Sequence, residues 1–156
     1  LMILSRETGM EVTIVRPPLV YGPGVKGNFH SLKKWAENGL PSLFAAVHNK
    51  RSLVHVANLC DLLITVLNHA NAGNQVFLVS DGRDFSTDEL IQSLAAKAGR
   101  RSLRVPVPPT ILRAAGNLVG RTEAIDRLTQ SLQIDLQKTN QILNWFPLDT
   151  SELDYY

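Results

Sequence analysis

The sequence predicts an α/β fold, because short runs of β-branched residues alternate with segments of helical periodicity. The chain has 156 residues, of which 44% are hydrophobic and 19% charged. This balance is typical of a globular domain with a core. Strands that alternate with helices usually pair in parallel, so we expect some parallel pairing here.

The first elements are a helix end and a strand. The opening run LMILSRETG has the pattern of the end of an amphipathic helix that stops at Gly9. No N-cap residue precedes it and no Met stands at position 1, so we expect a fragment that begins within or just before a helix. The run EVTIVRPPLV (11–20) is rich in β-branched residues and predicts a buried strand that is broken at Pro17 and Pro18.

A helix, a strand and a second helix are expected next. NFHSLKKWAENG predicts a short helix that ends at Gly39 and places three apolar residues on one face: Phe29, Leu32 and Trp35. A strand is expected at about Ser52 to Val56. The following run, CDLLITVLNHA, repeats apolar residues at helical spacing, with Asn58 as the expected N-cap.

The second half of the chain continues the alternation. NQVFLVSD predicts a strand, and Ser86 with Glu89 forms a capping box that opens a helix to Ala98, before Gly99. SLRVPVP predicts a short edge strand, because it contains prolines, and PPTILRAAGNLVG predicts a helix with Pro near its first position. The remaining run, TEAIDRLTQSLQIDLQKTNQILNW, is expected to be mostly helical, with Asp135 capping its last segment.

Charge and cysteine content narrow the possible partners. The net charge is +2, and the 16 basic residues are scattered without aromatic residues between them, which argues against a nucleic-acid surface. No apolar run approaches the roughly 18 residues that span a bilayer, and no signal peptide opens the chain, so no membrane partner is expected. Cys60 is the only cysteine, which excludes an internal disulfide and favours the cytoplasm.

No metal site is expected. Asp81, Asp84 and Asp88 lie close together in the sequence, but they lack the spacing and the final Glu of a calcium-binding EF-hand loop. We interpret these three residues as charges of a turn and of the first turn of a helix.

The stretch VYGPGVKGNF (20–29) contains three glycines at the spacing G-x-G-x-x-G. A dinucleotide-binding loop of this kind needs a carboxylate about 20 residues later, and residues 42–49 contain none. Pro23 also stiffens the turn where the cofactor would approach. A phosphate-binding P-loop would need Lys after its last glycine, whereas Asn28 follows Gly27. We therefore expect no dinucleotide-binding loop here.

Ordered blocks between residues 12 and 145 carry a family resemblance. These are IVRPPLVYGPG, KGNF, NKRSLVHVANLCDLL, NQVFLVSDGRDFSTDELIQSLAAKAG and SLQIDLQKTNQILNW. In this order they resemble segments of the extended short-chain dehydrogenase/reductases, the family of nucleotide-sugar epimerases and dehydratases. The third block resembles R-x-[YFL]-[IV]-[HY]-V-x-D-L of that family, and the last resembles its D-x-x-K…L-G-W ending. Within the family, these blocks most resemble those of bacterial UDP-glucose and UDP-N-acetylglucosamine 4-epimerases.

The resemblance implies the C-terminal part of an NAD(P)-binding Rossmann fold together with a substrate-binding lobe. Residues 1–27 would end the Rossmann domain, and residues 28–156 would mainly form the lobe, with 52–80 returning to the Rossmann core. The family's Y-x-x-x-K pair and its glycine-rich loop lie upstream of these blocks, and Tyr21 has Val25 four residues later. The chain is therefore expected to be half of an NAD-dependent enzyme, inactive alone and without a catalytic residue of its own.

The resemblance also assigns binding residues. Four would lie against the nicotinamide of NAD: Pro17, Pro18, Leu19 and Val20. Four would contact the substrate: Tyr21, Asn28, Arg51 and Arg127. Four of these residues also have a structural interpretation. In it, the two prolines end a strand, Tyr21 packs a loop against the core, and Asn28 caps a helix.

Arg51 is the sharpest of these assignments. A guanidinium can hold a diphosphate in bidentate geometry, and the family places an Arg here for that purpose. The alternative is a solvated surface Arg. Arg127 would supply a second basic contact, although the family's R-x-G-D element is absent around it. His55 is expected inside the fold, and Asn58, which replaces the family's usual Asp, is given a structural role.

The resemblance implies that the intact protein is an epimerase. It would oxidise a UDP-sugar at carbon 4 with bound NAD and return the hydride to the other face, and it would be a homodimer. Two alternatives stay open: a nucleotide-sugar dehydratase or reductase of the same family, and a non-catalytic binding module derived from it. A Y-x-x-x-K pair upstream of Leu1 would favour the enzymes.

Overall fold

The computed structural model describes residues 3, 7–25 and 27–150, and the chain divides into two units. Unit 1 contains Leu1–Gly24, Ser52–Arg83 and Ile134–Tyr156, and unit 2 contains Val25–Arg51 and Asp84–Gln133. Residues 52–80, which the resemblance returns to the Rossmann core, thus belong to the same unit as residues 1–24. The helix end that we expect before Gly9 falls mostly on residues outside those described.

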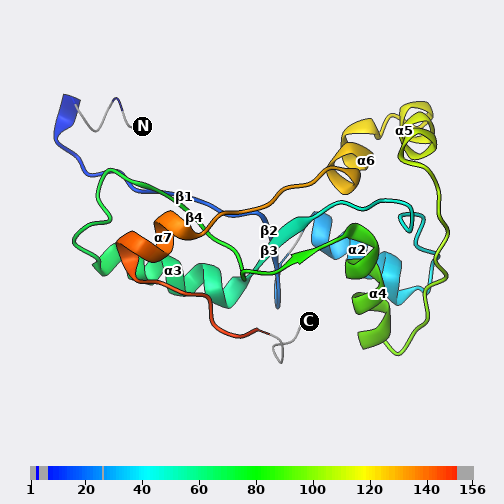
Figure 1. Cartoon of the computed structure of the whole chain (residues 1–156), viewed down its shortest axis with the longest axis horizontal. Helices are drawn as coiled ribbons and strands as arrows, with labels where there is room; N and C mark the ends of the chain where they lie inside the picture. Colours follow the sequence, from blue (N-terminus) through cyan, green and yellow to red (C-terminus); the bar gives the residue numbers. More distant parts are fainter. Residues whose placement is uncertain (1–2, 4–6, 26, 151–156) are drawn as a thin grey trace. The chain divides into compact units, whose positions relative to one another are not determined.

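Unit 1 is built on parallel strand pairs (Figure 1). The strand β1 (Ile14–Arg16) pairs with β4 (Val76–Leu78), and β2 (Leu19–Tyr21) pairs with β3 (Arg51–His55). Pro17 and Pro18 lie between β1 and β2, so the predicted break is confirmed. Neither proline has an N–H to donate to a strand ladder.

Helices α3 (Val56–Asn68) and α7 (Gln137–Leu143) complete the core of unit 1. Its buried members are Val54, Leu62, Ala72, Phe77, Val79, Leu143 and Trp145. The indole Nε1 of Trp145 donates to Asp61 Oδ2 of α3 at 2.7 Å, and Thr139 Oγ1 of α7 donates to the carbonyl of Leu78 at 2.7 Å. These two bonds fasten the C-terminal segment to both α3 and β4.

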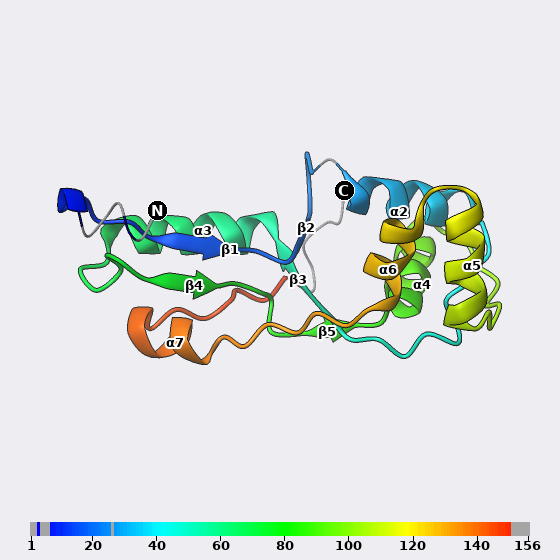
Figure 2. The ribbon, with the colours of Figure 1, turned by 90° about the horizontal axis from the view of Figure 1, so that it is seen from above.

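Unit 2 consists of two helix pairs and the short strand β5 (Asp84–Phe85). Helix α2 (Asn28–Glu37) packs on α4 (Thr87–Lys97), and α5 (Pro109–Leu118) packs on α6 (Thr122–Thr129) (Figure 2). The helix that we expect from Phe29 onward is confirmed, but its buried face is made of Phe29, Leu32 and Ala36. Trp35 is partly exposed, and its Nε1 donates to the carbonyl of Pro41 at 3.1 Å.

Local signals at helix starts in unit 2 are confirmed. The backbone N–H of Glu89 donates to Ser86 Oγ at 3.1 Å, and that of Ser86 donates to Glu89 Oε2 at 2.7 Å, which is a complete capping box. Helix α5 begins with Pro109, as predicted.

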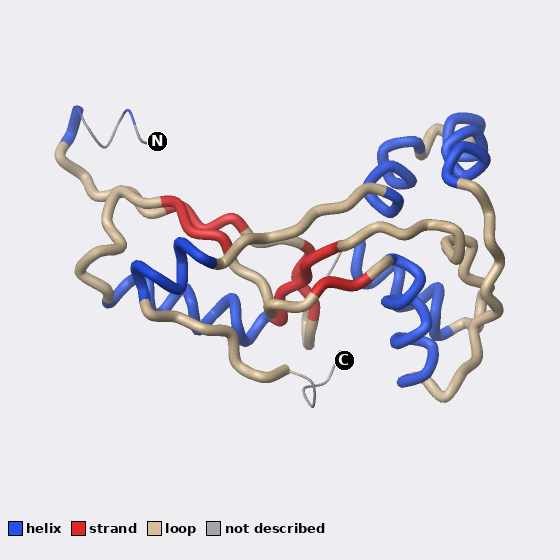
Figure 3. The backbone as a smooth tube through the Cα atoms, viewed as in Figure 1, coloured by secondary structure: helices blue, strands red, loops and turns tan. Residues whose placement is uncertain are grey.

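The predicted edge strand SLRVPVP is wrong. The segment is a loop with isolated bridges, one between Arg104 and Ser42 and one between Pro106 and Phe44 (Figure 3). Pro106 and Pro108 have no N–H, so a continuous ladder cannot form across them.

The run after α6 is not continuously helical. The N–H of Leu132 donates to the carbonyl of Lys50 at 2.8 Å, and the N–H of Lys50 donates to Ser131 Oγ at 3.0 Å. These hydrogen bonds with a distant segment hold the run extended and so override its helical pattern. The helix resumes at α7, whose N-cap is Leu136, so the prediction that Asp135 caps this segment is wrong. Asp135 lies one residue earlier, and its Oδ1 accepts the N–H of Gln137 at 2.8 Å.

Removal of the capping box should destabilise unit 2. We expect Ser86→Ala to lower the free energy of unfolding by about 1 kcal/mol, because Glu89 N–H loses its acceptor. Ser86→Asn, which keeps a capping oxygen, should lose much less. Urea unfolding followed by circular dichroism measures both variants, and an equal loss in the two would contradict this role of the cap.

Candidate functional site

The carboxylate of Asp81 joins four parts of unit 1. Its Oδ2 accepts from the hydroxyl of Tyr21 at 2.6 Å and from Thr150 Oγ1 at 3.3 Å. The same carboxylate accepts the backbone N–H of His55 at 3.0 Å and Asn58 Nδ2 at 2.7 Å. One side chain therefore links β2, the end of β3, α3 and the C-terminal segment. This role is more than the turn charge that we expect from the sequence.

Asn58 lies inside α3, so the prediction that it caps this helix is wrong. The N-cap is His55, whose Nδ1 accepts the N–H of Ala57 at 3.1 Å. Asn58 is fully buried, and besides Asp81 it bonds both backbone groups of Leu148, at 2.9 Å and 3.2 Å. An amide suits this position because it donates to Asp81, whereas the Asp usual in the family would place two carboxylates in contact.

The imidazole of His55 occupies the space beside Gly22. Because Nδ1 accepts a hydrogen bond, the neutral ring carries its proton on Nε2, which is buried and has no hydrogen-bond partner among the described residues. A Cβ at Gly22 would lie 2.8 Å from this nitrogen, and Gly22 has φ of 121°, so only glycine fits here. His55 is thus buried at the end of a strand, as expected.

Tyr21 is part of the interior of unit 1. Its side chain is buried, its hydroxyl bonds Asp81 and Thr150, and its ring meets the imidazole of His55 edge-on, with centroids 5.1 Å apart. This is the geometry of the alternative in which Tyr21 plugs the loop against the core. Its role as a substrate contact stays a prediction.

The four predicted nicotinamide contacts surround the break between β1 and β2. Pro17 is exposed and directly follows the carboxyl end of β1, which is the edge of a parallel sheet where ligands usually bind. Val20 instead packs against the core of unit 1. The role of Pro17, Pro18 and Leu19 as cofactor contacts stays a prediction.

The helix that follows the glycine loop packs within unit 2. The last glycine of the loop, Gly27, is the N-cap of α2, so the alternative in which Asn28 caps this helix is wrong. Helix α2 belongs to unit 2 and packs on α4, whereas β2 belongs to unit 1. A dinucleotide fold needs the helix after the loop to pack on the sheet that precedes it. The contacts of α2 agree with our interpretation of the loop.

Arg51 binds the C-terminal end of α6. Its Nη1 donates to the carbonyl of Arg127 and, at 3.0 Å, to the carbonyl of Gln130. Helix ends leave carbonyls without partners, and a cation there is favoured by the helix dipole. Partial burial lowers the pKa of the guanidinium from its ordinary value. Nε and Nη2 make no hydrogen bond with described residues, and the role of Arg51 as a substrate contact stays a prediction.

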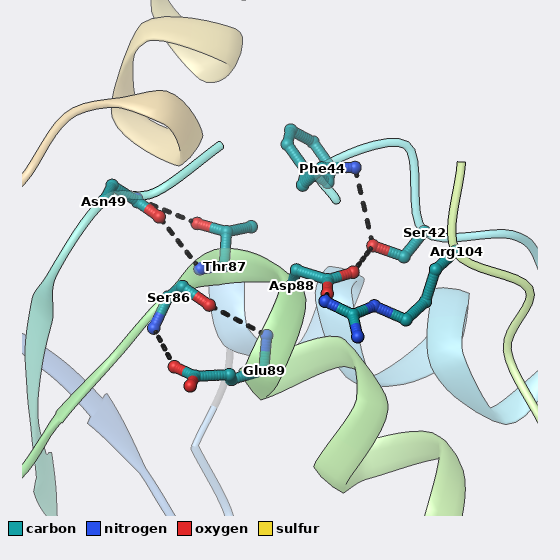
Figure 4. A network of polar contacts seen from close by, with 8 residues as sticks. All are labelled: Ser42, Phe44, Asn49, Ser86, Thr87, Asp88, Glu89 and Arg104. Atoms are coloured by element: carbon teal, nitrogen blue, oxygen red, sulfur yellow. Dashed lines mark hydrogen bonds and ion pairs between the residues drawn. The ribbon is translucent and has the colours of Figure 1, made fainter. Parts of the chain in front are cut away.

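Asn49 and Thr87 satisfy further groups at the same helix end. Asn49 Nδ2 donates to the carbonyls of Leu128 and Gln130 and to Thr87 Oγ1, each at 3.1 Å. Thr87 Oγ1 donates to the Leu128 carbonyl at 2.5 Å, and Asn49 Oδ1 accepts the N–H of Thr87 at 3.0 Å (Figure 4). This network could not be predicted from the sequence, because its members are far apart along the chain.

Arg127, the predicted substrate contact that lies in α6, pairs with a residue of its own helix. The guanidinium of Arg127 is exposed and lies 3.5 Å from Glu123 Oε2, one helical turn earlier. The structure therefore brings Arg51 to the backbone of Arg127 and not to its side chain. Asn28 is the first residue of α2, where backbone N–H groups are without helical partners.

A hollow of about 450 Å³ lies elsewhere in unit 2. Its lining residues are Ala45, Val47, His48, Asn49, Lys50, Asp84, Phe85, Ser86, Asp88, Glu89 and Arg104. Asp88 accepts from Ser42 Oγ at 2.5 Å, and its Oδ2 lies 2.7 Å from Arg104 Nη2 as an ion pair without a well-aligned hydrogen bond (Figure 4). None of the eight predicted binding residues lines this hollow.

Neither a metal site nor a membrane-spanning helix is found among the described residues. No group of three or more His, Cys, Asp or Glu side chains there is placed to hold a metal ion. In the same part of the chain, no helix is long and apolar enough to cross a membrane.

Comparison with known proteins identifies a family and similar relatives. The model of the NAD-dependent epimerase/dehydratase family matches residues 2–80. A UDP-glucose 4-epimerase of Vibrio cholerae is 45% identical over 151 residues, which cover 96% of this chain and 46% of that protein. The chain thus spans less than half of this relative.

Solved structures share the fold. A UDP-glucose 4-epimerase of Thermotoga maritima with UDP-glucose has a TM-score of 0.66 at 20% identity, over 93% of this chain and 43% of its own. A dTDP-glucose 4,6-dehydratase of Streptomyces venezuelae with NAD has a TM-score of 0.69 at 17% identity, over 97% and 43%. The α/β prediction is confirmed, and the fold is that of the corresponding part of these Rossmann-fold enzymes.

Loss of the Asp81 carboxylate should destabilise unit 1. We expect Asp81→Asn to lower the free energy of unfolding by about 2 kcal/mol, because the charge-assisted bonds to His55 and Tyr21 weaken. Tyr21→Phe, which removes one of these bonds, should cost about 1 kcal/mol. Urea titration measures both changes, and an unchanged unfolding midpoint in Asp81→Asn would contradict the linking role.

Proposed function

The chain belongs to the NAD-dependent epimerase/dehydratase family, and from this premise we propose that the whole protein is a 4-epimerase of a UDP-linked hexose. The observation that carries the proposal is the 45% identity to a UDP-glucose 4-epimerase over nearly all of this chain. The expected substrates are UDP-glucose with UDP-galactose, or the corresponding N-acetylhexosamines. The proposed setting is the cytoplasm, in polysaccharide biosynthesis, with a homodimer as the working form.

When bound, NAD would supply a reversible hydride acceptor for carbon 4 of the sugar. The residues of this chain that would hold it are Pro17, Pro18 and Leu19, with Val20 behind them in the core. These residues follow the carboxyl end of β1 and have uncharged side chains. They would therefore shape the nicotinamide side of the site and exclude water. The acid/base pair expected for this family, Y-x-x-x-K, does not lie in this chain, so the proton transfers belong to residues outside it.

The UDP group would be held by unit 2. Arg51 is suited to this task because Nη1 is fixed by two carbonyls of α6, which leaves the Nε and Nη2 edge in a set orientation. The N-terminus of α2 at Asn28 would add backbone N–H groups for the diphosphate. Arg127 and Tyr21 are secondary candidates, because Arg127 pairs with Glu123 and Tyr21 is committed to Asp81.

The product of the reaction distinguishes an epimerase from a dehydratase of the same family. We expect the whole protein to interconvert UDP-glucose and UDP-galactose, or their N-acetylated forms, without a net change in oxidation state or loss of water. Chromatography of the nucleotide sugars with mass detection distinguishes the outcomes. A product lighter by one water would instead assign the protein to the dehydratases, and no turnover of any UDP-hexose would overturn the proposal.

Binding by this chain alone tests the role of Arg51. We expect UDP to bind with a Kd on the order of 1 mM, and both Arg51→Lys and Arg51→Ala to weaken it about tenfold, since Lys keeps the charge but lacks the fork. Calorimetric titration measures the affinity, and circular dichroism checks that α6 stays folded.

A matched control is Arg113→Ala, which removes an exposed, ion-paired arginine of the same unit. It should leave UDP binding unchanged. Equal losses in Arg113→Ala and Arg51→Ala, or no loss in either Arg51 variant, would contradict the assignment of Arg51. Tight binding of NAD by this chain would contradict our interpretation of the glycine loop.

A further inference from the structure

A buried amide fastens the end of α6 to the start of α4. Asn49 is 5% exposed, and its Nδ2 donates to the carbonyls of Leu128 and Gln130, each at 3.1 Å. Its Oδ1 accepts the backbone N–H of Thr87, the first residue of α4, at 3.0 Å (Figure 4). The attachment therefore uses both the donor and the acceptor of the Asn49 side chain.

The hydroxyl of Thr87 completes this attachment. Thr87 is 1% exposed, and its Oγ1 donates to the carbonyl of Leu128 at 2.5 Å and accepts from Asn49 Nδ2 at 3.1 Å. In a buried network of this kind, the loss of one partner leaves another polar group unsatisfied, so the network resists displacement. The backbone of residues 128–130 is thus fixed with respect to α4.

Arg51 takes its orientation from the same stretch of backbone. Its Nη1 donates to the carbonyls of Arg127 and Gln130. The Gln130 carbonyl therefore accepts from both Asn49 and Arg51. A long side chain has many rotamers, and these two carbonyls restrict where its guanidinium lies. A shift of the α6 end would consequently release the guanidinium.

We propose that Asn49 and Thr87 are positioning residues for the diphosphate of a UDP-sugar, acting through the end of α6 and the guanidinium of Arg51. The inference rests on the diphosphate contact proposed above for Arg51, and neither Asn49 nor Thr87 itself touches the ligand. A side chain that is ordered in advance loses less conformational entropy on binding. Disruption of the network should therefore weaken the affinity for UDP about fivefold.

Ser86 provides a control for a role that is only structural. It precedes Thr87 and caps the same helix, through hydrogen bonds with Glu89. Neither of these bonds reaches the end of α6. Ser86→Ala should therefore lower the stability of unit 2 while the order of the Arg51 side chain and the affinity for UDP stay unchanged.

Two measurements on the full chain test the proposal. NMR relaxation of the Arg51 Nε–H group reports how mobile the guanidinium is, and calorimetric titration reports the affinity for UDP. Thr87→Val removes the hydroxyl but keeps the shape of the side chain, whereas Thr87→Ser keeps the hydroxyl. Asn49→Asp keeps the acceptor for Thr87 and loses both donors.

We expect Thr87→Val and Asn49→Asp to make the Arg51 guanidinium more mobile and to weaken UDP binding about fivefold. Thr87→Ser should retain most of the affinity, as a rescue by the conservative variant. In an Arg51→Ala background, Thr87→Val should cause no further loss, because the residue through which it acts is gone. Circular dichroism should show that all variants are folded.

The other outcomes overturn the proposal. If the Arg51 guanidinium is as ordered in Thr87→Val and Asn49→Asp as in the wild-type chain, the network does not position it, whether or not UDP binds. If the guanidinium becomes mobile without a loss of affinity, or if Ser86→Ala weakens UDP binding equally, the role is structural only. If the wild-type chain does not bind UDP, or Arg51→Ala binds it equally well, the proposed contact of Arg51 fails, and the NMR readout separates this case from the first.

Discussion

The buried hydrogen bonds of Asp81 are the interaction on which the order of unit 1 depends. Parallel strands only a few residues long offer few ladder bonds, so side chains must fix where each strand ends. A single carboxylate does this for β2, β3, α3 and the C-terminal segment at once. Among these partners, Tyr21 ends β2, the strand that begins directly after the turn at Pro17 and Pro18.

In unit 2, side chains from distant segments also fix the end of an element, here the C-terminus of α6. The last carbonyls of this helix are satisfied by Asn49, Arg51 and Thr87, which come from two distant segments. A guanidinium already held by two carbonyls has little rotamer freedom left to lose, which would favour the anion contact that we propose for Arg51. A structural role of Arg51 and a binding role are thus compatible.

Features that depend on neighbouring residues could be predicted from the sequence, and features that depend on distant ones could not. The capping box at Ser86, the start of α5 at Pro109 and the strand break at Pro17 are set within a few residues. The partners of Asp81, in contrast, lie 23 to 69 residues away along the chain. The prediction that Asn58 caps α3 is wrong for this reason. Asn favours N-cap positions, but Asn58 lies inside the helix, where it bonds Asp81 and Leu148.

The division of the chain into interleaved segments limits how such a protein can evolve. The backbone passes between the two units four times, after residues 24, 51, 83 and 133. Neither unit is therefore a continuous stretch that recombination could excise or append. Exchange of one substrate lobe for another would need several coordinated junctions, so new specificities should arise by point substitution within a lobe and not by the shuffling of modules.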